Sequence, residues 1–392
     1  MKGYFSFEKR SIWGALKGSL LVMSVCGFFF VAAVAYAEDV KPATSAMSFE
    51  DLKKALGMSI YLQGGYTGNF ISTASQENDL RVFDHKADSF TLDLAQIRFQ
   101  KDPALGNVGY KFKLSAGETA KWIHSRGLSG ASLTSPQTGE GTDAFDLTEA
   151  YVSYNAALGK GLRFDFGKMV TYFGAEVIEA QDNPNYSRSF LFNYAIPFTH
   201  TGLKISYPFT EALTTALYVT NGWDNSNDNN KDKSYGLSIS YTPVEMFSVI
   251  LNTMYGPEQD SITSNKRTLY DAIVTIKPTK QLAIILNADS GQEENVVATG
   301  TAKWVGAAAI VKYDFSDRYS LAVRGEIFDD KDGFRTGMAQ RLTEVTVTPE
   351  IRLNGGVVLR PEYRHDSSDQ TFFNGGQKKN QDTIALGVMY TW

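Results

Sequence analysis

The sequence predicts an all-β protein, namely a transmembrane antiparallel up-and-down β-barrel of about sixteen strands. From residue 58 onward, apolar and polar residues alternate in short segments, which is the pattern of strands with one apolar face. The connections between these segments alternate between long and short, and aromatic residues gather beside the short ones. A β-sandwich also has many short strands, but only an outer-membrane barrel has a reason to place short turns on one side and long loops on the other.

The first 37 of the 392 residues are expected to be a signal peptide. Four Lys or Arg residues precede position 18, an apolar stretch over 19–34 follows, and small residues lead to an expected cleavage after Ala37. The alternative is an uncleaved helical anchor, for which this stretch is near the shortest length that spans a bilayer.

Composition narrows the function classes. Residues 38–392 contain 34 Lys and Arg against 42 Asp and Glu, a net charge of −8, whereas the whole chain has a net charge of −5. This charge argues against a nucleic-acid partner. The single cysteine, Cys26, lies in the expected signal peptide, so the remaining chain is expected to hold no disulfide, no cysteine-ligated metal and no attached haem.

The sequence shows none of the usual motifs of an enzyme. It has no nucleophile elbow, phosphate-binding loop or dinucleotide fingerprint. The histidines have no metal-ligand spacing, and all are expected in loops or at strand edges, with none in mid-strand: His85, His124, His200 and His365. The sequence therefore predicts no catalytic residue, no cofactor and no metal site.

Residues 38–57 are expected to be a periplasmic linker that ends in a short helix. Ser48 and Asp51 have the spacing of a helix N-cap, apolar residues follow on one face, and Gly57 ends the helix.

Residues 58–392 are expected to form the barrel domain. An even number of strands places both ends of the barrel on one side. The long connections include 171–199 and 291–303. In the segment 89–100 the apolar parity changes, and a bulge near Ala95 and Gln96 would reconcile its two halves. The candidate strands lie near residues 58–68, 89–100, 108–118, 145–155, 162–170, 200–207, 213–221, 234–242, 247–255, 269–277, 282–290, 304–313, 319–329, 342–351, 357–364 and 383–392.

If the apolar parity faces lipid, the opposite parity lines the lumen. The candidate pore-wall residues carry both signs: Lys111, Lys113, Glu149, Arg163, Asp165, Lys204, Arg324, Glu326, Arg360, Glu362 and Arg364. Sixteen strands enclose too wide a space for wall side chains to fill, so a water-filled channel is expected, with weak ion selectivity because the two signs balance. The alternative for each residue is a structural brace, in which an Arg–Glu pair only holds side chains against the wall.

The connection over 171–199 is longer and more apolar than a loop in free water should be. It is expected to fold into the barrel and narrow the pore. The alternative is packing over the rim or at a subunit interface. Its candidate constriction residues are Glu176, Glu179, Asp182, Arg188 and His200.

Several motifs in and around this connection carry a resemblance to a known family. The segments Gly174–Glu179, Asn185–Ser189 and Ala195–Gly202, with Glu149–Tyr154 upstream and Asn221–Asp224 downstream, are similar to the outer-membrane β-barrel porins called OmpL-like, or the second putative β-barrel porin family. The resemblance covers nearly all of the chain after residue 37. It implies a bacterial outer-membrane porin for small hydrophilic solutes, and it does not carry over a substrate.

The expected function is therefore a porin in the outer membrane of a Gram-negative bacterium, through which ions and small hydrophilic solutes diffuse passively. The alternative is a structural barrel that houses or docks a partner, such as a periplasmic cytochrome in an electron conduit. The expected partners are outer-membrane lipid, the solutes, a homotrimer by analogy with other sixteen-stranded porins, and the barrel-assembly machinery. Tyr390 and Trp392 resemble the terminal signal by which that machinery recognises its clients.

Overall fold

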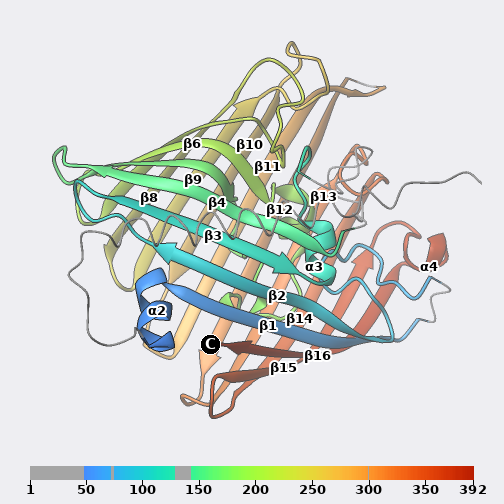
Figure 1. Ribbon diagram of the computed structural model, residues 1–392. Coiled ribbons are helices and arrows are strands. Elements are labelled where there is room, and N and C mark those ends of the chain that lie inside the picture. Colours follow the sequence, from blue (N-terminus) through green and yellow to red (C-terminus); the bar gives the residue numbers. More distant parts are fainter. Residues whose placement is uncertain (1–47, 72–74, 129–142, 299) are drawn as a thin grey trace, which may run out of the picture. The chain divides into compact units, whose positions relative to one another are not determined.

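The structure is a computed structural model, and it describes residues 48–71, 75–128, 143–298 and 300–392 (Figure 1). The expected signal peptide with its cleavage after Ala37, and the linker up to residue 47, lie outside these residues. The short helix is confirmed as α2, Phe49–Leu56. Its start is capped as expected, because the Asp51 amide donates to the Ser48 hydroxyl at 3.2 Å and this hydroxyl donates to the Asp51 carboxylate at 2.6 Å.

None of the helices in the described ranges is both long enough and apolar enough to cross a membrane.

Sixteen strands form one closed antiparallel barrel, which confirms the predicted fold class. Each strand pairs with its neighbours in sequence, and β1 also pairs with β16. The short helices α3, Glu118–Trp122, and α4, Phe373–Gly376, lie in long connections. The strands are β1 Met58–Asn69, β2 Ser89–Lys101, β3 Val108–Ala116, β4 Phe145–Ala156, β5 Leu162–Val170, β6 Thr199–Pro208, β7 Leu213–Thr220, β8 Ser234–Val244, β9 Phe247–Gly256, β10 Arg267–Ile276, β11 Leu282–Val297, β12 Gly300–Asp314, β13 Tyr319–Asp330, β14 Gln340–Arg352, β15 Val357–Ser368 and β16 Asn380–Thr391.

The barrel closes between its first and last strands. The ladder of β1 and β16 runs from Tyr61 opposite Thr391 to Asn69 opposite Thr383. Beyond its end, Ile60 and Trp392 exchange two backbone hydrogen bonds of 2.9 Å. Because every strand has two partners, no row of backbone donors and acceptors is left open toward lipid.

The two faces of the barrel follow the alternation of the sequence. In β8 the apolar residues Leu237, Ile239 and Tyr241 point outward, and Ser238 and Ser240 point into the barrel. The aromatic residues beside the short turns are on the outer face, where they form a belt at one end. Exposed members of this belt are Tyr154, Tyr241, Tyr313 and Tyr319.

The parity change in β2 comes from a bulge, but the predicted position is wrong by two residues. Gln63 of β1 pairs with Leu94 and Gly64 pairs with Leu92, so Asp93 is the extra residue, and not Ala95 or Gln96. Asp93 and Leu94 are both buried inside the barrel. The bulge thus adds a carboxylate to the inner face.

One predicted long connection is also wrong. β11 extends to Val297 and β12 begins at Gly300, so most of 291–303 is strand. β15 extends to Ser368, which puts His365 within a strand, against the prediction that no histidine is in mid-strand. Both errors have one cause. The strands continue past the lipid into water, where the backbone ladder remains and the apolar alternation stops.

The hydrophobic core lies inside the barrel and not on its outer face. It is built from long connections and from inward strand residues near them, and it includes Phe83, Ile178, Phe190, Trp223 and Trp304. The end with the long connections is therefore largely filled by side chains of the chain itself.

The outward direction of Ile239 can be tested by substitution. Ile239→Arg is expected to lower the free energy of unfolding in lipid by about 2–4 kcal/mol, because a charge near the bilayer midplane loses its hydration. The measurement is a urea titration in lipid vesicles. The control is Ser238→Arg, on the inner face of the same strand, which should change stability much less. Equal losses in the two variants would contradict the assigned faces.

Candidate functional site

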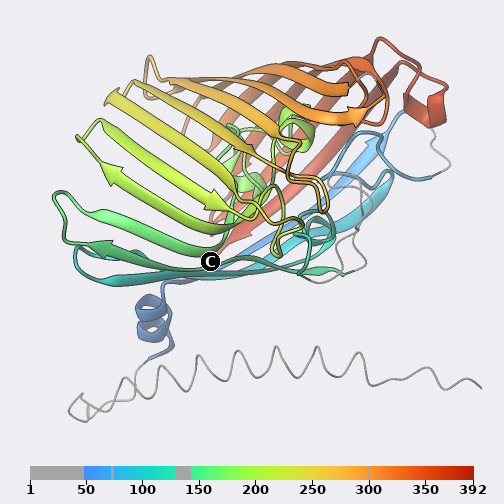
Figure 2. The ribbon, with the colours of Figure 1, turned by 90° about the horizontal axis from the view of Figure 1, so that it is seen from above.

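The connection between β5 and β6, residues 171–198, folds into the barrel, and we call it the inner segment. Figure 2 shows it (green) within the ring of strands. The Tyr172 ring stacks on Tyr218 of β7 with centroids 3.8 Å apart, and the Tyr186 hydroxyl donates to Asp93 of β2 at 2.6 Å. The Leu191 amide donates to Glu326 of β13 at 3.1 Å. Partners so far apart around the ring can be reached together only from inside.

Short-range bonds shape the inner segment. The Asn183 side chain accepts from the Val177 amide at 2.8 Å and donates to the Val177 carbonyl at 2.7 Å, which closes a turn. Residues Ala180–Asp182 form a 3₁₀ turn, and Leu191–Ala195 form a π-helical turn. These local bonds satisfy backbone groups that would otherwise be buried without partners.

Glycines of two strands make room for the inner segment. A side chain at Gly387 of β16 would place its Cβ 2.4 Å from the Tyr186 ring, and one at Gly65 of β1 would lie 2.1 Å from the Tyr186 hydroxyl. The absence of side chains at these inward positions lets the Tyr186 ring approach the wall closely.

Two wall carboxylates hold the inner segment through its backbone. Glu326 accepts hydrogen bonds from the amides of Phe190 and Leu191 at 2.5 and 3.1 Å. Glu362 accepts from the amides of Tyr186 and Ser187 at 2.7 and 3.0 Å. Each of the two carboxyl groups therefore anchors two consecutive residues of the inner segment.

Three wall arginines complete the anchoring. Arg324 bonds Glu176 at 2.7 Å and Glu344 at 2.6 Å. Arg360 donates to the carbonyls of Ala180 and Asn185, and Arg364 donates to the Arg188 carbonyl at 2.5 Å. All three guanidinium groups are buried. Arg324, Glu326, Arg360, Glu362 and Arg364 therefore have the arrangement of structural braces and lie under the inner segment.

Among the predicted constriction residues, only Asp182 is exposed. Arg188 is buried, lies over the Phe83 ring with a centroid distance of 4.5 Å, and donates to the Tyr186 carbonyl at 2.6 Å. His200 is buried at the start of β6 beside Thr171. Glu176 and Glu179 are buried in ion pairs.

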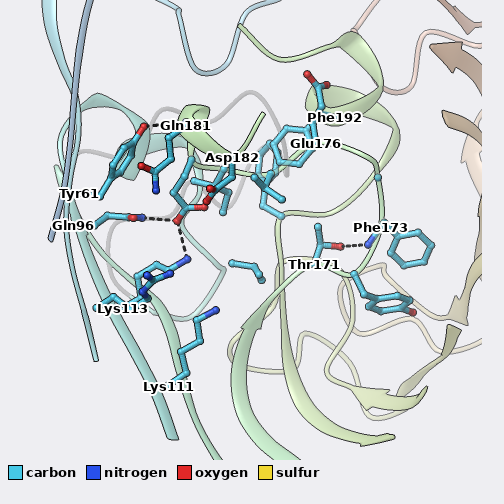
Figure 3. Close-up of a pocket in the computed structure, with 18 of the residues that line it drawn as sticks. Tyr61, Gln96, Lys111, Lys113, Thr171, Phe173, Glu176, Gln181, Asp182 and Phe192 are labelled. Carbon is cyan, nitrogen blue, oxygen red and sulfur yellow. Dashed lines mark hydrogen bonds and ion pairs between the residues drawn. The ribbon is translucent and has the colours of Figure 1, made fainter. Parts of the chain in front are cut away.

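A cavity of about 280 Å³ lies between the inner segment and the wall formed by β1, β2 and β3. Figure 3 shows Lys111 and Lys113 reaching from this wall toward the inner segment. Lys113 bridges Glu149 at 2.8 Å and Glu179 at 2.7 Å, and Lys111 bonds Glu149 at 2.9 Å. Glu149 takes its inward position from a second bulge, since the pairing of β3 and β4 skips Thr148.

A second ionic group lies on the next strands. Asp165 of β5 bonds Arg163 at 2.8 Å and Lys204 of β6 at 3.7 Å. The structure therefore brings six of the predicted wall residues together on β3 to β6, apart from the five braces: Lys111, Lys113, Glu149, Arg163, Asp165 and Lys204.

Sequence reasoning missed three residues of this region. Tyr61, Gln96 and Arg98 line the cavity. The sequence predicts the strands of all three, but the misplaced bulge leaves the inward parity of Gln96 and Arg98 on β2 undetermined. The signal that identifies the inward residues is the alternation of polar Gln96 and Arg98 with apolar neighbours, which begins after the bulge at Asp93.

Electrostatics favour ionised Glu179. Burial alone would raise the pKa of this carboxyl group, but its ion pair with Lys113 and the hydrogen bond from Gln96 outweigh burial and lower the pKa to about 2. The contact between the inner segment and β3 is therefore an ion pair over the whole neutral and mildly acidic range.

A closed sixteen-stranded barrel with an apolar exterior, a charged interior and an inward-folded connection has the architecture of an outer-membrane porin. The sequence profile of the family described as "Putative beta-barrel porin-2, OmpL-like" matches residues 55–392, and the chain belongs to this family. The protein is accordingly a porin of the outer membrane of a Gram-negative bacterium, and its outer face contacts lipid.

Solved structures of outer-membrane channels and other outer-membrane proteins share the fold at low identity. The outer membrane channel DcaP of Acinetobacter baumannii is 10% identical, with a TM-score of 0.59 over 86% of this chain and 96% of that chain. The anion-selective porin from Comamonas acidovorans is 8% identical, with a TM-score of 0.57 over 86% and 98%. The trimer form of OmpT from Vibrio cholerae is 11% identical, with a TM-score of 0.53 over 86% and 98%. Comparison with curated protein sequences gave no match.

The low pKa of Glu179 gives a pH-dependent stability. Because the folded pKa of about 2 lies below the ordinary value of 4.5, this carboxylate stabilises the fold above pH 4.5, and the contribution is lost as the pH falls toward 2. Glu179→Gln should therefore be less stable than the native protein at pH 7, and the difference should shrink between pH 4.5 and 2. Urea titrations at a series of pH values measure this.

The control is Glu245→Gln, in the exposed turn between β8 and β9, which should follow the native curve. A difference between Glu179→Gln and the native protein that stays constant over this pH range would contradict the ion-pair assignment.

Proposed function

We propose that ions and small hydrophilic solutes diffuse passively through the barrel along a water-filled path past the cavity beside the inner segment. The observation that carries the proposal is a set of inward charges on β2 to β6 that remain partly exposed, among them Lys111, Arg163 and Lys204. A charged side chain at membrane depth has to face water or a partner, which favours a solvated path along this wall. Asp182 faces the same path from the inner segment.

We propose no enzymatic activity and no resident cofactor for this barrel. The alternative of a barrel that houses a periplasmic cytochrome has no observation in its favour. The inner segment already occupies much of the interior and bonds to both sides of it. A second protein would have to displace those contacts.

The channel proposal predicts discrete conductance. Purified protein in a planar lipid bilayer should give uniform conductance steps, and vesicles that contain it should take up small sugars faster than large ones. Ser59→Trp, which adds bulk to the cavity lining, should lower the step size. Asn354→Trp, in the exposed turn between β14 and β15, should leave the step size unchanged. Absence of conductance from folded native protein would refute the proposal.

The proposal includes two protein partners, a homotrimer and the barrel-assembly machinery. Chemical crosslinking of the purified protein tests the trimer. For assembly, Trp392 is the informative residue, because its backbone bonds to Ile60 close the barrel while its ring lies under the Lys53 ammonium group at 3.4 Å.

Trp392→Ala retains the closing backbone bonds and removes the aromatic ring. We expect less folded barrel in the outer membrane of cells, with unchanged folding of the purified chain in detergent, because recognition of the ring by the assembly machinery is lost. Heat-dependent mobility on gels measures the folded fraction. The control is Tyr313→Ala, which removes another aromatic side chain near a short turn. Normal insertion of Trp392→Ala would exclude the ring as an assembly signal.

A further inference from the structure

The inner wall contains buried carboxylates that each hold two or three cations. Glu149 holds Lys111 and Lys113, at 2.9 and 2.8 Å. Asp165 holds Arg163 and Lys204, at 2.8 and 3.7 Å. Glu350, on the other side of the barrel, is the centre of a third such group: Lys312 at 3.7 Å, Arg352 at 2.6 Å and Arg360 at 2.6 Å.

Carboxylates and cations of the first two groups differ in exposure. The side chains of Glu149 and Asp165 are each only 2% exposed, whereas those of Lys111, Arg163 and Lys204 are 18%, 29% and 31% exposed. The anions therefore lie against the wall together with Lys113, which is 6% exposed, and the other three cations extend over them into the lumen. A wall with nearly balanced charge presents a positive surface to water.

The partly exposed cations form a row on four strands of this wall, β2, β3, β5 and β6, with a gap at β4. Arg98 on β2 donates to the Ser59 hydroxyl at 2.9 Å and lines the cavity next to Lys111 on β3. Arg163 and Lys204 follow on β5 and β6. Strand β4 lies between β3 and β5, and its inward residues are uncharged at this level: Tyr151, Ser153 and Asn155. Among the inward residues of strands β2 to β6, the charged side chains that are partly exposed are therefore all cations.

Two exposed carboxylates oppose the row. Asp182 extends from the inner segment across the cavity, and Asp102 lies in the turn after β2, where it bonds Arg163 at 3.3 Å. They do not cancel four cations. An ion in the lumen interacts most strongly with the nearest exposed charges, because interaction energy falls with distance and with screening by water.

We infer that the channel passes small anions, including small carboxylates, in preference to cations, and that Arg98, Lys111, Arg163 and Lys204 form the path of these anions. The inference rests on the proposed channel function and names its class of solute. It departs from the weak selectivity expected from the sequence, because counting charges cannot tell which of them reach water. A row of like charges along a low-dielectric wall raises the local concentration of the opposite ion.

The test is the reversal potential of the purified full-length protein in a planar bilayer, under a tenfold gradient of KCl and then of potassium acetate. The sign of the potential should show that chloride, and also acetate, is more permeant than potassium. The double variant Lys111→Gln/Lys204→Gln should reduce the ratio of chloride to potassium permeability. At a distance of about 8 Å in water, each lost charge changes the local concentration of an ion by roughly twofold, downward for chloride and upward for potassium, so the permeability ratio changes by about fourfold for each charge.

This variant is designed to fold. When Lys111 is neutralised, Glu149 keeps Lys113, and when Lys204 is neutralised, Asp165 keeps Arg163. No buried carboxylate loses its last cation. The matched control is Lys303→Gln, which removes an exposed lysine from the outward face of β12 and should leave the reversal potential unchanged.

The outcomes separate the two proposals. Absence of conductance steps refutes the channel function. Conductance steps with a reversal potential near zero, or one that favours potassium, leave the channel in place and overturn the anion preference. Anion preference that persists unchanged in the double variant overturns the assignment of the path to this wall. A shift in the double variant but not in Lys303→Gln supports the inference.

Discussion

Closure of the backbone ladder between β1 and β16 is the constraint on which the rest of the structure depends. A strand in lipid has no water to satisfy its amides and carbonyls, so each one needs two protein neighbours. Closure supplies the second neighbour for the first and last strands, through the pairing of Tyr61 with Thr391 and onward to Thr383. It also separates an inside from an outside. From that point the parity of each residue decides whether it meets lipid or the lumen.

A closed barrel of sixteen strands creates an interior that its wall side chains cannot fill, and the inner segment occupies part of that space. The segment is held mainly by polar and charged wall groups, with Glu326 and Glu362 on its amides and Arg324 on Glu176. Removing one partner of a buried ion pair costs about 3–5 kcal/mol, because the other charge is left uncompensated. Each pair therefore disfavours other positions of the segment, even where the pair itself adds little net stability.

How well a feature can be predicted from the sequence depends on how local its physical cause is. Lipid imposes apolar alternation on every strand it touches, so the sixteen strands, the closed barrel and the six wall residues on β3 to β6 could be predicted. Alternation ends where lipid ends, which is why the sequence predicts a long loop where the structure has a hairpin at Val297 and Gly300. Whether a wall charge is buried in an ion pair or exposed to the lumen depends on contacts such as that of Arg324 with Glu176, which joins residues 148 positions apart. No periodicity in the sequence reports on such a contact.

The difference between buried and exposed wall charges explains how a wall with nearly balanced charge can act on solutes as if it had one sign. Carboxylate side chains of Asp165 and Glu149 are short, so they stay at the strand surface. Lysine and arginine have long apolar stems that can lie along the wall while the charged group extends into water. A carboxylate with two cationic partners is thus covered by them. These partners offset the free-energy cost of removing the carboxylate from water. Mixed charge on strands of this kind is therefore not neutral to a passing ion, because side-chain length sorts the two signs by depth.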